Sequence, residues 1–358
     1  MTDLPPKARA PLLLLGFVAL LVGAAGGVAR LGFGIQAPSQ GVAWHGALMT
    51  SAFFGTLIAL ERAVATGRLW SYLAPAASGA GGIVLVLGAP QSGFALMLFG
   101  AAVFALASIS IWRRETALHT GVLVLGTLAL VAANAMLLAG LPAEAALPCW
   151  LTFFVLTIGG ERLELSRLAP VPIAARRAFA IVAVAQIAVA LAAVMWFEPA
   201  LHLLGLLFLV TAVWFARYDI AMRTVRSSGQ TRYIAVCLLA GYAWLAIGAA
   251  LLFFVWGRNS VPEIWDAGLH AILLGFVFSM VFGHAPIILP AVLRIPLPYR
   301  PVLYLPLAAL HASLLVRVTG DLAGLPALRA GGGAANALAL ALFIALAAWL
   351  ALTARRKR

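Results

Sequence analysis

The sequence predicts an all-α membrane protein that crosses the bilayer about twelve times. Of its 358 residues, 64% are hydrophobic and only 10% are charged. Many apolar runs are long enough to span a bilayer as helices, each of which needs about 20 residues. The runs do not alternate between apolar and polar residues as barrel strands do, and only helices and closed barrels satisfy the backbone in lipid. We therefore expect a single integral membrane domain that comprises residues 1–358.

The apolar runs divide the chain into twelve predicted spans. The first run is interpreted as a membrane helix because it shows no convincing cleavage site of a signal peptide. The sixth run is the shortest, and the tenth is expected to end before Pro286 and Pro290. The predicted spans are residues 11–29, 41–60, 71–88, 92–112, 118–139, 147–160, 177–197, 200–218, 232–256, 265–285, 301–318 and 332–353.

Basic residues concentrate on one side of these spans. The two tails and the even-numbered connections hold all but four of the 24 lysines and arginines. By the positive-inside rule, both termini, with short tails 1–10 and 354–358, are expected in the cytoplasm of a bacterial inner membrane. The net charge of +13 is therefore a topology signal. Membrane lipid is an expected partner and nucleic acid is not.

Three histidines fall at a similar depth in the predicted outer half of the membrane. His45, His270 and His311 lie about 6, 8 and 10 Å inside the outer ends of the second, tenth and eleventh spans. A histidine inside a membrane helix is costly and marks a functional site by default, although a single one often only joins two helices. Three at one depth favour a cofactor or metal site, with these three as the candidate metal ligands.

A heme suits this arrangement because it needs a dry slot between helices and one or two axial ligands. His45 and His270 are the candidate ligands. Met49 follows His45 by four residues and is expected on the same helix face. Arg317 is placed to meet the heme propionates, since a guanidinium suits carboxylates.

The remaining polar residues of the spans receive simpler interpretations. Asn134 and Gln186 are expected to join neighbouring helices. The adjacent pair Glu161-Arg162 is expected to form an ion pair at the membrane interface. Because Glu161 and Asp266 lie at span ends, a proton relay of acidic residues has few parts. His119 and His202 lie at interfaces and are expected to contact only their neighbours, and His284 either caps a broken helix before Pro286 or binds something at the inner face.

Four short segments of the chain are similar to the motifs of one known family. The segment WHGALM from Trp44 to Met49 resembles the WHxHEM signature of the NnrS family, heme-containing membrane proteins of the nitric oxide response. GYAWL at 241–245, with Gly248, is similar to its YAWLxLG segment. HA at 270–271 followed by GH at 283–284 resembles its HA…GH region, and LVRV at 315–318 resembles its LxRV stretch. The resemblance covers most of the chain in helix count and adds Trp44 to the candidate cofactor-binding residues.

The resemblance implies heme and, through copper attributed to the family, a second metal. More remotely, the chain is similar to subunit I of the heme-copper oxidases, with three four-helix arcs and a heme between helices two and ten. Carried over, the axial pair is His45 and His270. The chain departs from the pattern at Ala47 and Leu48, which replace the second histidine and the glutamate of WHxHEM. Its sixth and seventh predicted spans hold no histidine, so copper is not favoured.

These observations predict a protein with one or two b-type hemes, lacking the oxidase copper site. It would respond to nitric oxide, bind this or another diatomic gas, or transfer electrons from an unidentified electron donor. Enzymatic activity is not expected, and if present it would be that of a heme-dependent nitric oxide oxidoreductase. The alternative is a cofactor-free transporter or permease. Its support is the predicted break at His284, since unwound helices commonly form transport sites.

Overall fold

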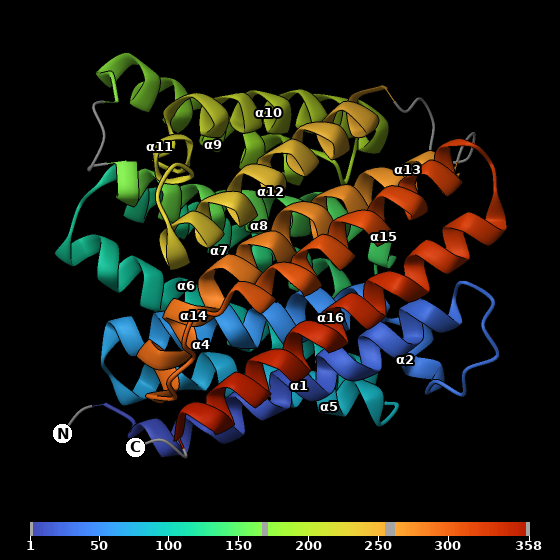
Figure 1. Cartoon of the computed structure of the whole chain (residues 1–358), viewed down its shortest axis with the longest axis horizontal. Helices are drawn as coiled ribbons and strands as arrows, with labels where there is room; N and C mark the ends of the chain where they lie inside the picture. Colours follow the sequence, from blue (N-terminus) through green and yellow to red (C-terminus); the bar gives the residue numbers. More distant parts are fainter. Residues whose placement is uncertain (1–2, 167–170, 255–261, 356–358) are drawn as a thin grey trace. The chain divides into compact units, whose positions relative to one another are not determined.

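The structure, a computed structural model, describes residues 3–166, 171–254 and 262–355. Within these ranges it contains helices and no strands, which confirms the predicted all-α class (Figure 1). Twelve helical runs are long and apolar enough to cross a membrane, the number that was predicted. The protein is therefore a polytopic α-helical membrane protein.

The twelve spans overlap the predicted ones throughout. The sixth, predicted as a short run, is a full span of 23 residues. The tenth differs most, because it runs to Leu293 instead of ending before Pro286. The spans are Pro6–Ala29, His45–Thr66, Leu69–Val86, Pro90–Arg114, Leu118–Leu138, Ala143–Leu165, Ile173–Ala192, Phe197–Tyr218, Gly229–Phe254, Glu263–Leu293, Pro301–Leu322 and Pro326–Ala354.

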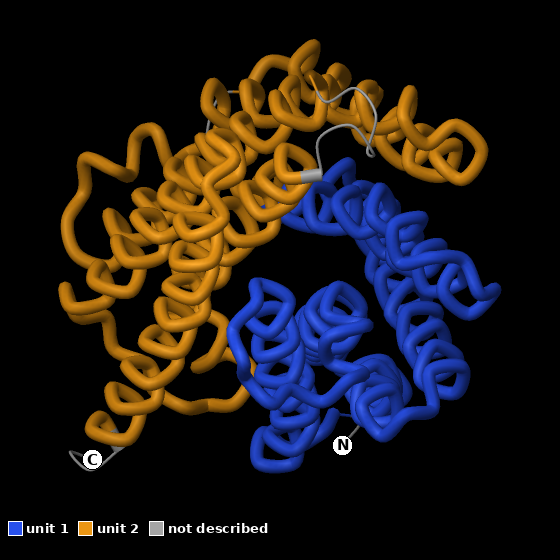
Figure 2. Tube along the Cα trace, turned by 90° about the vertical axis from the view of Figure 1, so that its right-hand side faces the viewer, with its two compact units in different colours: residues 1–161 blue, residues 162–358 orange. Residues whose placement is uncertain are grey.

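The chain divides into two compact units, residues 1–161 and 162–358 (Figure 2). The boundary falls inside one helix, so that Glu161 belongs to the first unit and Arg162 to the second.

Unit 1 is built from the first six spans. Its second span is composite: one short α-helical piece is followed by a π-helix and then by regular α-helix. The elements are α1 (Pro6–Ala29), α2 (Ser39–Ala43), α3 (His45–Ala47), the π-helix η1 (Leu48–Phe54), α4 (Gly55–Thr66), the 3-10 turn η2 (Leu69–Tyr72), α5 (Leu73–Val86), α6 (Pro90–Arg114), α7 (Leu118–Leu138) and α8 (Ala143–Leu165).

Helix α8 holds the core of unit 1 together. In its most apolar stretch, 78% of the residues are buried, the largest share among the twelve spans. The Trp150 indole donates a hydrogen bond to Ser51 Oγ of η1 at 3.0 Å. The Phe154 ring meets Phe54 of η1 edge to face at 4.8 Å, and Phe153 meets Phe104 of α6 at 6.4 Å. Aromatic side chains thus fasten the π-helix to the centre of the unit.

Unit 2 contains the remaining spans. Its tenth-span helix is again composite, with a π-helix between two α-helices. The elements are α9 (Ile173–Ala192), α10 (Phe197–Tyr218), α11 (Ala221–Thr224), α12 (Gly229–Phe254), α13 (Pro262–His270), the π-helix η4 (Ala271–Phe278), α14 (Ser279–Leu293), the 3-10 turn η5 (Pro301–Leu303), α15 (Tyr304–Leu322) and α16 (Pro326–Arg355). Helix α12 packs along α13, η4 and α14, and α15 packs against α13, η4 and α16.

Polar side chains join helices inside each unit as predicted. Asn134 of α7 donates a hydrogen bond to the Met97 carbonyl oxygen of α6 at 3.2 Å. Gln186 of α9 donates to the Thr211 hydroxyl of α10 at 2.8 Å. The outward faces are apolar, and Ile181 and Leu338 are each 70% exposed. Apolar surface of this kind on membrane-spanning helices is covered by lipid.

Candidate functional site

The imidazole of His45 packs against α1 in unit 1. Its Nδ1 lies 2.6 Å from the carbonyl oxygen of Gly23. Because a carbonyl oxygen only accepts, Nδ1 carries the proton, and the lone pair of the neutral ring lies on Nε2. Gly27 admits the ring, since a Cβ there would lie 2.7 Å from its Cε1 atom. The Met49 sulfur sits over Gly23 in the same way, so Met49 and His45 share one face.

Both histidines predicted as heme ligands are followed by a π-helix. In unit 1, η1 begins at Leu48, three residues after His45, and Trp44 closes the turn before it with its ring against Phe94 at 4.9 Å. In unit 2, η4 begins at the residue directly after His270. π-helical segments are rare and occur frequently at functional sites. The sequence carries no signal for them, because the wider turn depends on packing.

The side chain of His270 is fixed by Asp266, one helical turn earlier. Its Nδ1 lies 2.9 Å from the Asp266 carbonyl oxygen and 3.2 Å from the carboxylate. Both partners accept hydrogen bonds only, so Nδ1 carries the proton and Nε2 holds the lone pair. Nε2 has no hydrogen-bond partner among the described residues. A carboxylate-oriented histidine with an available Nε2 is the arrangement that ligating histidines adopt.

Asp266 also anchors a group of charged side chains between α13, α15 and α16, which we call the His270 cluster (Asp266, His270, Arg317, Asp321 and Arg329). The Arg317 guanidinium donates a hydrogen bond to the Asp266 carboxylate at 2.8 Å, and Arg329 lies 3.5 Å from the same oxygen. Arg329 in turn lies 3.0 Å from Asp321, whose side chain is fully buried. The two carboxylates and the two guanidinium groups balance in charge.

One hydrogen-bond donor of Arg317 has no partner in the His270 cluster. Its Nε is buried and has no hydrogen-bond partner among the described residues. The group that was predicted to meet a heme propionate therefore shares its charge with Asp266 and still has an N–H to offer. That role of Arg317 remains a prediction.

His311 of α15 has the opposite tautomer to the other two. The Trp244 indole N–H of α12 donates to His311 Nδ1 at 3.0 Å. Nδ1 is therefore the acceptor, and the proton of the neutral ring lies on Nε2, which is buried and has no partner among the described residues. Of the two roles predicted for His311, a pocket residue that donates a hydrogen bond suits this arrangement better than a metal ligand.

The glycines of the GYAWL segment and of η4 allow this contact. A Cβ on Gly275 of η4 would lie 2.3 Å from Trp244 Cγ, so the indole lies directly on the π-helix backbone. A Cβ on Gly248 would lie 2.8 Å from the Gly268 carbonyl oxygen. Small residues let membrane helices approach this closely. The segment predicted from the family resemblance thus positions Trp244 between η4 and His311.

Replacing Gly275 with alanine should destabilise unit 2 by about 1–3 kcal/mol, because the added Cβ overpacks the contact with Trp244. Gly268, seven residues earlier in the same span, is the matched control. A Cβ at that position would lie no closer than 3.4 Å to its neighbours. Unfolding of the purified variants in mixed detergent micelles measures both effects. Equal stability of Gly275→Ala and Gly268→Ala would contradict the packing described.

The predicted break of the tenth span before Pro286 is wrong. Helix α14 continues through Pro286 and Pro290 and ends at Leu293, because a proline removes one backbone hydrogen bond without ending a helix supported by its neighbours. His284 therefore lies within the helix instead of capping a break. Its Nδ1 contacts the Met280 carbonyl oxygen at 2.7 Å. The support that a broken helix gave to the transporter alternative is lost.

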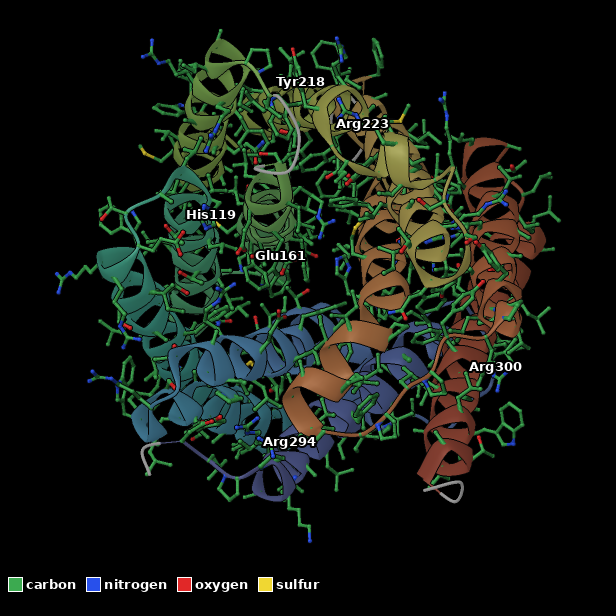
Figure 3. The ribbon with its side chains drawn as sticks, turned by 60° about the vertical axis from the view of Figure 1, so that its left-hand side comes forward. His119, Glu161, Tyr218, Arg223, Arg294 and Arg300 are labelled. Atoms are coloured by element: carbon green, nitrogen blue, oxygen red, sulfur yellow. The ribbon has the colours of Figure 1, made fainter. Side chains whose placement is uncertain are left out.

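A second group of buried polar residues was missed by the sequence reasoning. We call it the Asp219 cluster (Arg162, Asp219, Tyr242 and His284). Arg162 is only 3% exposed and donates from Nη2 to His284 Nε2 at 2.7 Å, instead of serving as the interfacial partner of Glu161. Asp219 directly follows α10, whose last residue, Tyr218, is labelled near Arg223 in Figure 3. It was overlooked because it lies outside the predicted spans.

The depths of the unit 2 histidines follow from the span bounds. His270 is seven residues after Glu263, and His311 is eleven residues before Leu322. These separations place the two side chains about 10 and about 16 Å from the span ends predicted to be outer. They differ by about one helical turn. Among the described residues, no three His, Cys, Asp or Glu side chains gather as a possible metal site. The metal role of His45, His270 and His311 remains a prediction.

Comparison with known protein families identifies a family and supplies no activity. A model for a domain of unknown function, DUF8744, matches residues 9–352. The chain belongs to this family. No curated protein and no solved structure matches the chain.

Proposed function

We propose that this protein binds heme in the membrane and that His270 is an axial ligand. The observation that carries the proposal is the geometry of His270. Asp266 holds its Nδ1, while Nε2 keeps a lone pair and has no hydrogen-bond partner among the described residues. Such a side chain is already oriented for an iron or another metal and pays little to adopt the ligating geometry. Bound heme would supply a redox-active iron that can take a diatomic gas.

His45 is the second proposed ligand. Its support is the hydrogen bond that holds Nδ1 on Gly23, the π-helix that follows it, and the resemblance of its segment to the NnrS family. His45 and His270 belong to different units, so their pairing on one heme rests on the sequence alone. Arg317 and Met49 are proposed as neighbours of the heme, with Arg317 Nε as the donor for a propionate.

The proposed role is nitric oxide response, gas binding or electron transfer at a bacterial inner membrane, with both termini in the cytoplasm. The buried Nε2–H of His311 favours the gas-binding form, because a bound diatomic gas can accept a hydrogen bond. The placement of basic residues supports the orientation.

An absorption spectrum of the detergent-purified protein, oxidised and dithionite-reduced, tests the proposal. We expect the sharp reduced bands of a six-coordinate b-type heme if both histidines ligate one iron. A five-coordinate spectrum that shifts on adding nitric oxide would instead support gas binding beside His311. A protein that purifies colourless after expression with ample heme would refute heme binding.

A cofactor-free transporter is the alternative, and one observation favours it. Arg162 and Asp219 place opposite charges in buried positions of unit 2, 3% and 4% exposed. Buried charges in membrane proteins often mark the path of an ion or substrate. The spectrum separates the two functions, since a transporter of this kind carries no pigment.

A further inference from the structure

Only one of the two carboxylate oxygens of Asp219 accepts a hydrogen bond of normal geometry in the described chain. Its Oδ1 accepts a hydrogen bond from the Ala221 backbone N–H at 2.7 Å, which caps the short helix α11. Its Oδ2 is buried and has no hydrogen-bond partner among the described residues. A buried carboxylate oxygen without a donor is costly in its charged form.

Two polar groups around Asp219 also have atoms that form no hydrogen bond of normal geometry in the described chain. The Arg162 guanidinium donates to His284 and not to the carboxylate, and its Nε is buried without a partner in the described chain. The Tyr242 hydroxyl, on a side chain that is 3% exposed, is a weak hydrogen-bonding neighbour of Asp219, and it has no partner of normal hydrogen-bond geometry in the described chain. Arg162 of α8 and Tyr242 of α12 are the charged and titratable groups that act on Asp219, and His284 of α14 acts through Arg162.

The contacts of His284 with Met280 and Arg162 suit a neutral imidazole ring. Its Nδ1 donates to the Met280 carbonyl oxygen, so its Nε2 is left to accept from Arg162. A proton on Nε2 would face the guanidinium directly, which is unfavourable between like charges. Asp219 Oδ2 is therefore the atom of the cluster that carries a lone pair and has no hydrogen-bond partner of normal geometry in the described chain.

We propose that the Asp219 cluster is a proton-binding site at the end of unit 2 predicted to face the cytoplasm, with Asp219 Oδ2 as the atom that binds. A proton from water forms an O–H bond with a lone pair of Oδ2, and the negative charge of the carboxylate is neutralised. No other bond breaks and no electron moves. Tyr242 has lone pairs to accept the new O–H group, which gives both oxygen atoms a hydrogen bond of normal geometry.

The electrostatics of the site agree with this assignment. Burial raises the pKa of the Asp219 carboxyl, and the Arg162 charge, the Ala221 N–H and the Tyr242 hydroxyl oppose the change without cancelling it. The protonated form therefore persists to higher pH than it does in an exposed aspartate. The proposal does not depend on heme, because no residue of the Asp219 cluster belongs to the proposed ligands.

Infrared difference spectroscopy of the full-length protein between about pH 5 and about pH 9 tests this site. We expect the carbonyl-stretch band of a protonated carboxyl group to grow as the pH falls. Asp219→Asn should remove a component of the band, and Asp321→Asn, which changes the other buried aspartate of unit 2, should leave that component in place. Glu164→Gln, which removes an exposed carboxylate two residues from Arg162, should leave it in place. A wild-type band that Asp219→Asn leaves unchanged, or no such band at all, would overturn the proposal.

If Asp219→Asn does not fold, the variant Tyr242→Phe tests the proposed proton-binding site. Tyr242→Phe keeps the carboxyl group and removes the acceptor for its proton, so the carbonyl band should shift to higher wavenumber. An unshifted band would overturn the proposal. Heme content is measured on the same samples, so that failure of the heme proposal and failure of the proton site are seen separately.

Discussion

Replacing His270 with alanine should lower the heme content of the purified protein by about tenfold or more. The change removes the nitrogen that Asp266 orients, and even loss of an orienting partner alone typically costs about 10–100-fold in affinity at ligated sites. Heme extraction, normalised to folded protein, gives the measurement. His45→Ala should have a comparable effect if His45 is the second ligand.

The matched control is His202→Ala. His202 is also a histidine of unit 2 with its Nδ1 on a backbone carbonyl, that of Phe253 at 2.5 Å, but it was assigned no ligand role. Added imidazole should restore the reduced bands of His270→Ala by occupying the space of the lost ring. Unchanged heme content in both His45→Ala and His270→Ala, with the proteins folded, would refute ligation by these residues.

The variant Asp266→Asn tests whether the Asp266 carboxylate acts on His270 as a heme ligand. An asparagine keeps the backbone carbonyl that His270 uses and removes the negative charge beside its ring. A ligand role for His270 then predicts a change in the reduced bands or in the heme reduction potential with heme still bound. A purely structural role for Asp266 would leave both unchanged.

Length and hydropathy were sufficient to predict the twelve spans, because a membrane helix requires a long apolar run that can be recognised in the sequence. The errors arose where charged residues and prolines lie inside helices. Helix α8 continues past Glu161 because Arg162 is buried against His284, a partner 122 positions away in the chain. Helix α14 continues past Pro286 for a similar reason: neighbouring helices support it.

The sequence indicated candidate site residues, but it did not indicate the contacts between them. The histidines and the GYAWL segment stood out as unusual in an apolar chain. Their roles depend on contacts between distant positions, such as Trp244 with His311, 67 positions apart. Which nitrogen of each histidine carries the proton follows from those partners and cannot be read from spacing. Asp219 gave one weak signal, a lone acidic residue among basic ones at the end of a span.

Breaking the ion pair between Asp266 and Arg317 should destabilise the protein by about 2–3 kcal/mol. Loss of one partner leaves the other charge partly buried without compensation, which costs about 3–5 kcal/mol for a fully buried pair. The expected value is smaller because 22% of the Asp266 side chain is exposed, against 9% for Arg317, and because Arg329 lies 3.5 Å from the same carboxylate. Asp266→Asn and Arg317→Gln, unfolded in mixed detergent micelles, provide the single-variant values.

The double variant Asp266→Asn/Arg317→Gln isolates the interaction itself. Because each single change strands one charge and the double change strands neither, the two costs should not add, and the coupling should be about 1–2 kcal/mol. The pair Asp3–Arg9 of unit 1 is the matched control. It has a similar separation of 2.7 Å, but 42% of the Asp3 side chain is exposed, so its coupling should be below about 1 kcal/mol. Equal coupling in the two pairs would mean that Asp266 is solvated. Its carboxylate would then lack the low-dielectric surroundings that make it effective in orienting His270, so the stability cycle also bears on the proposed ligand.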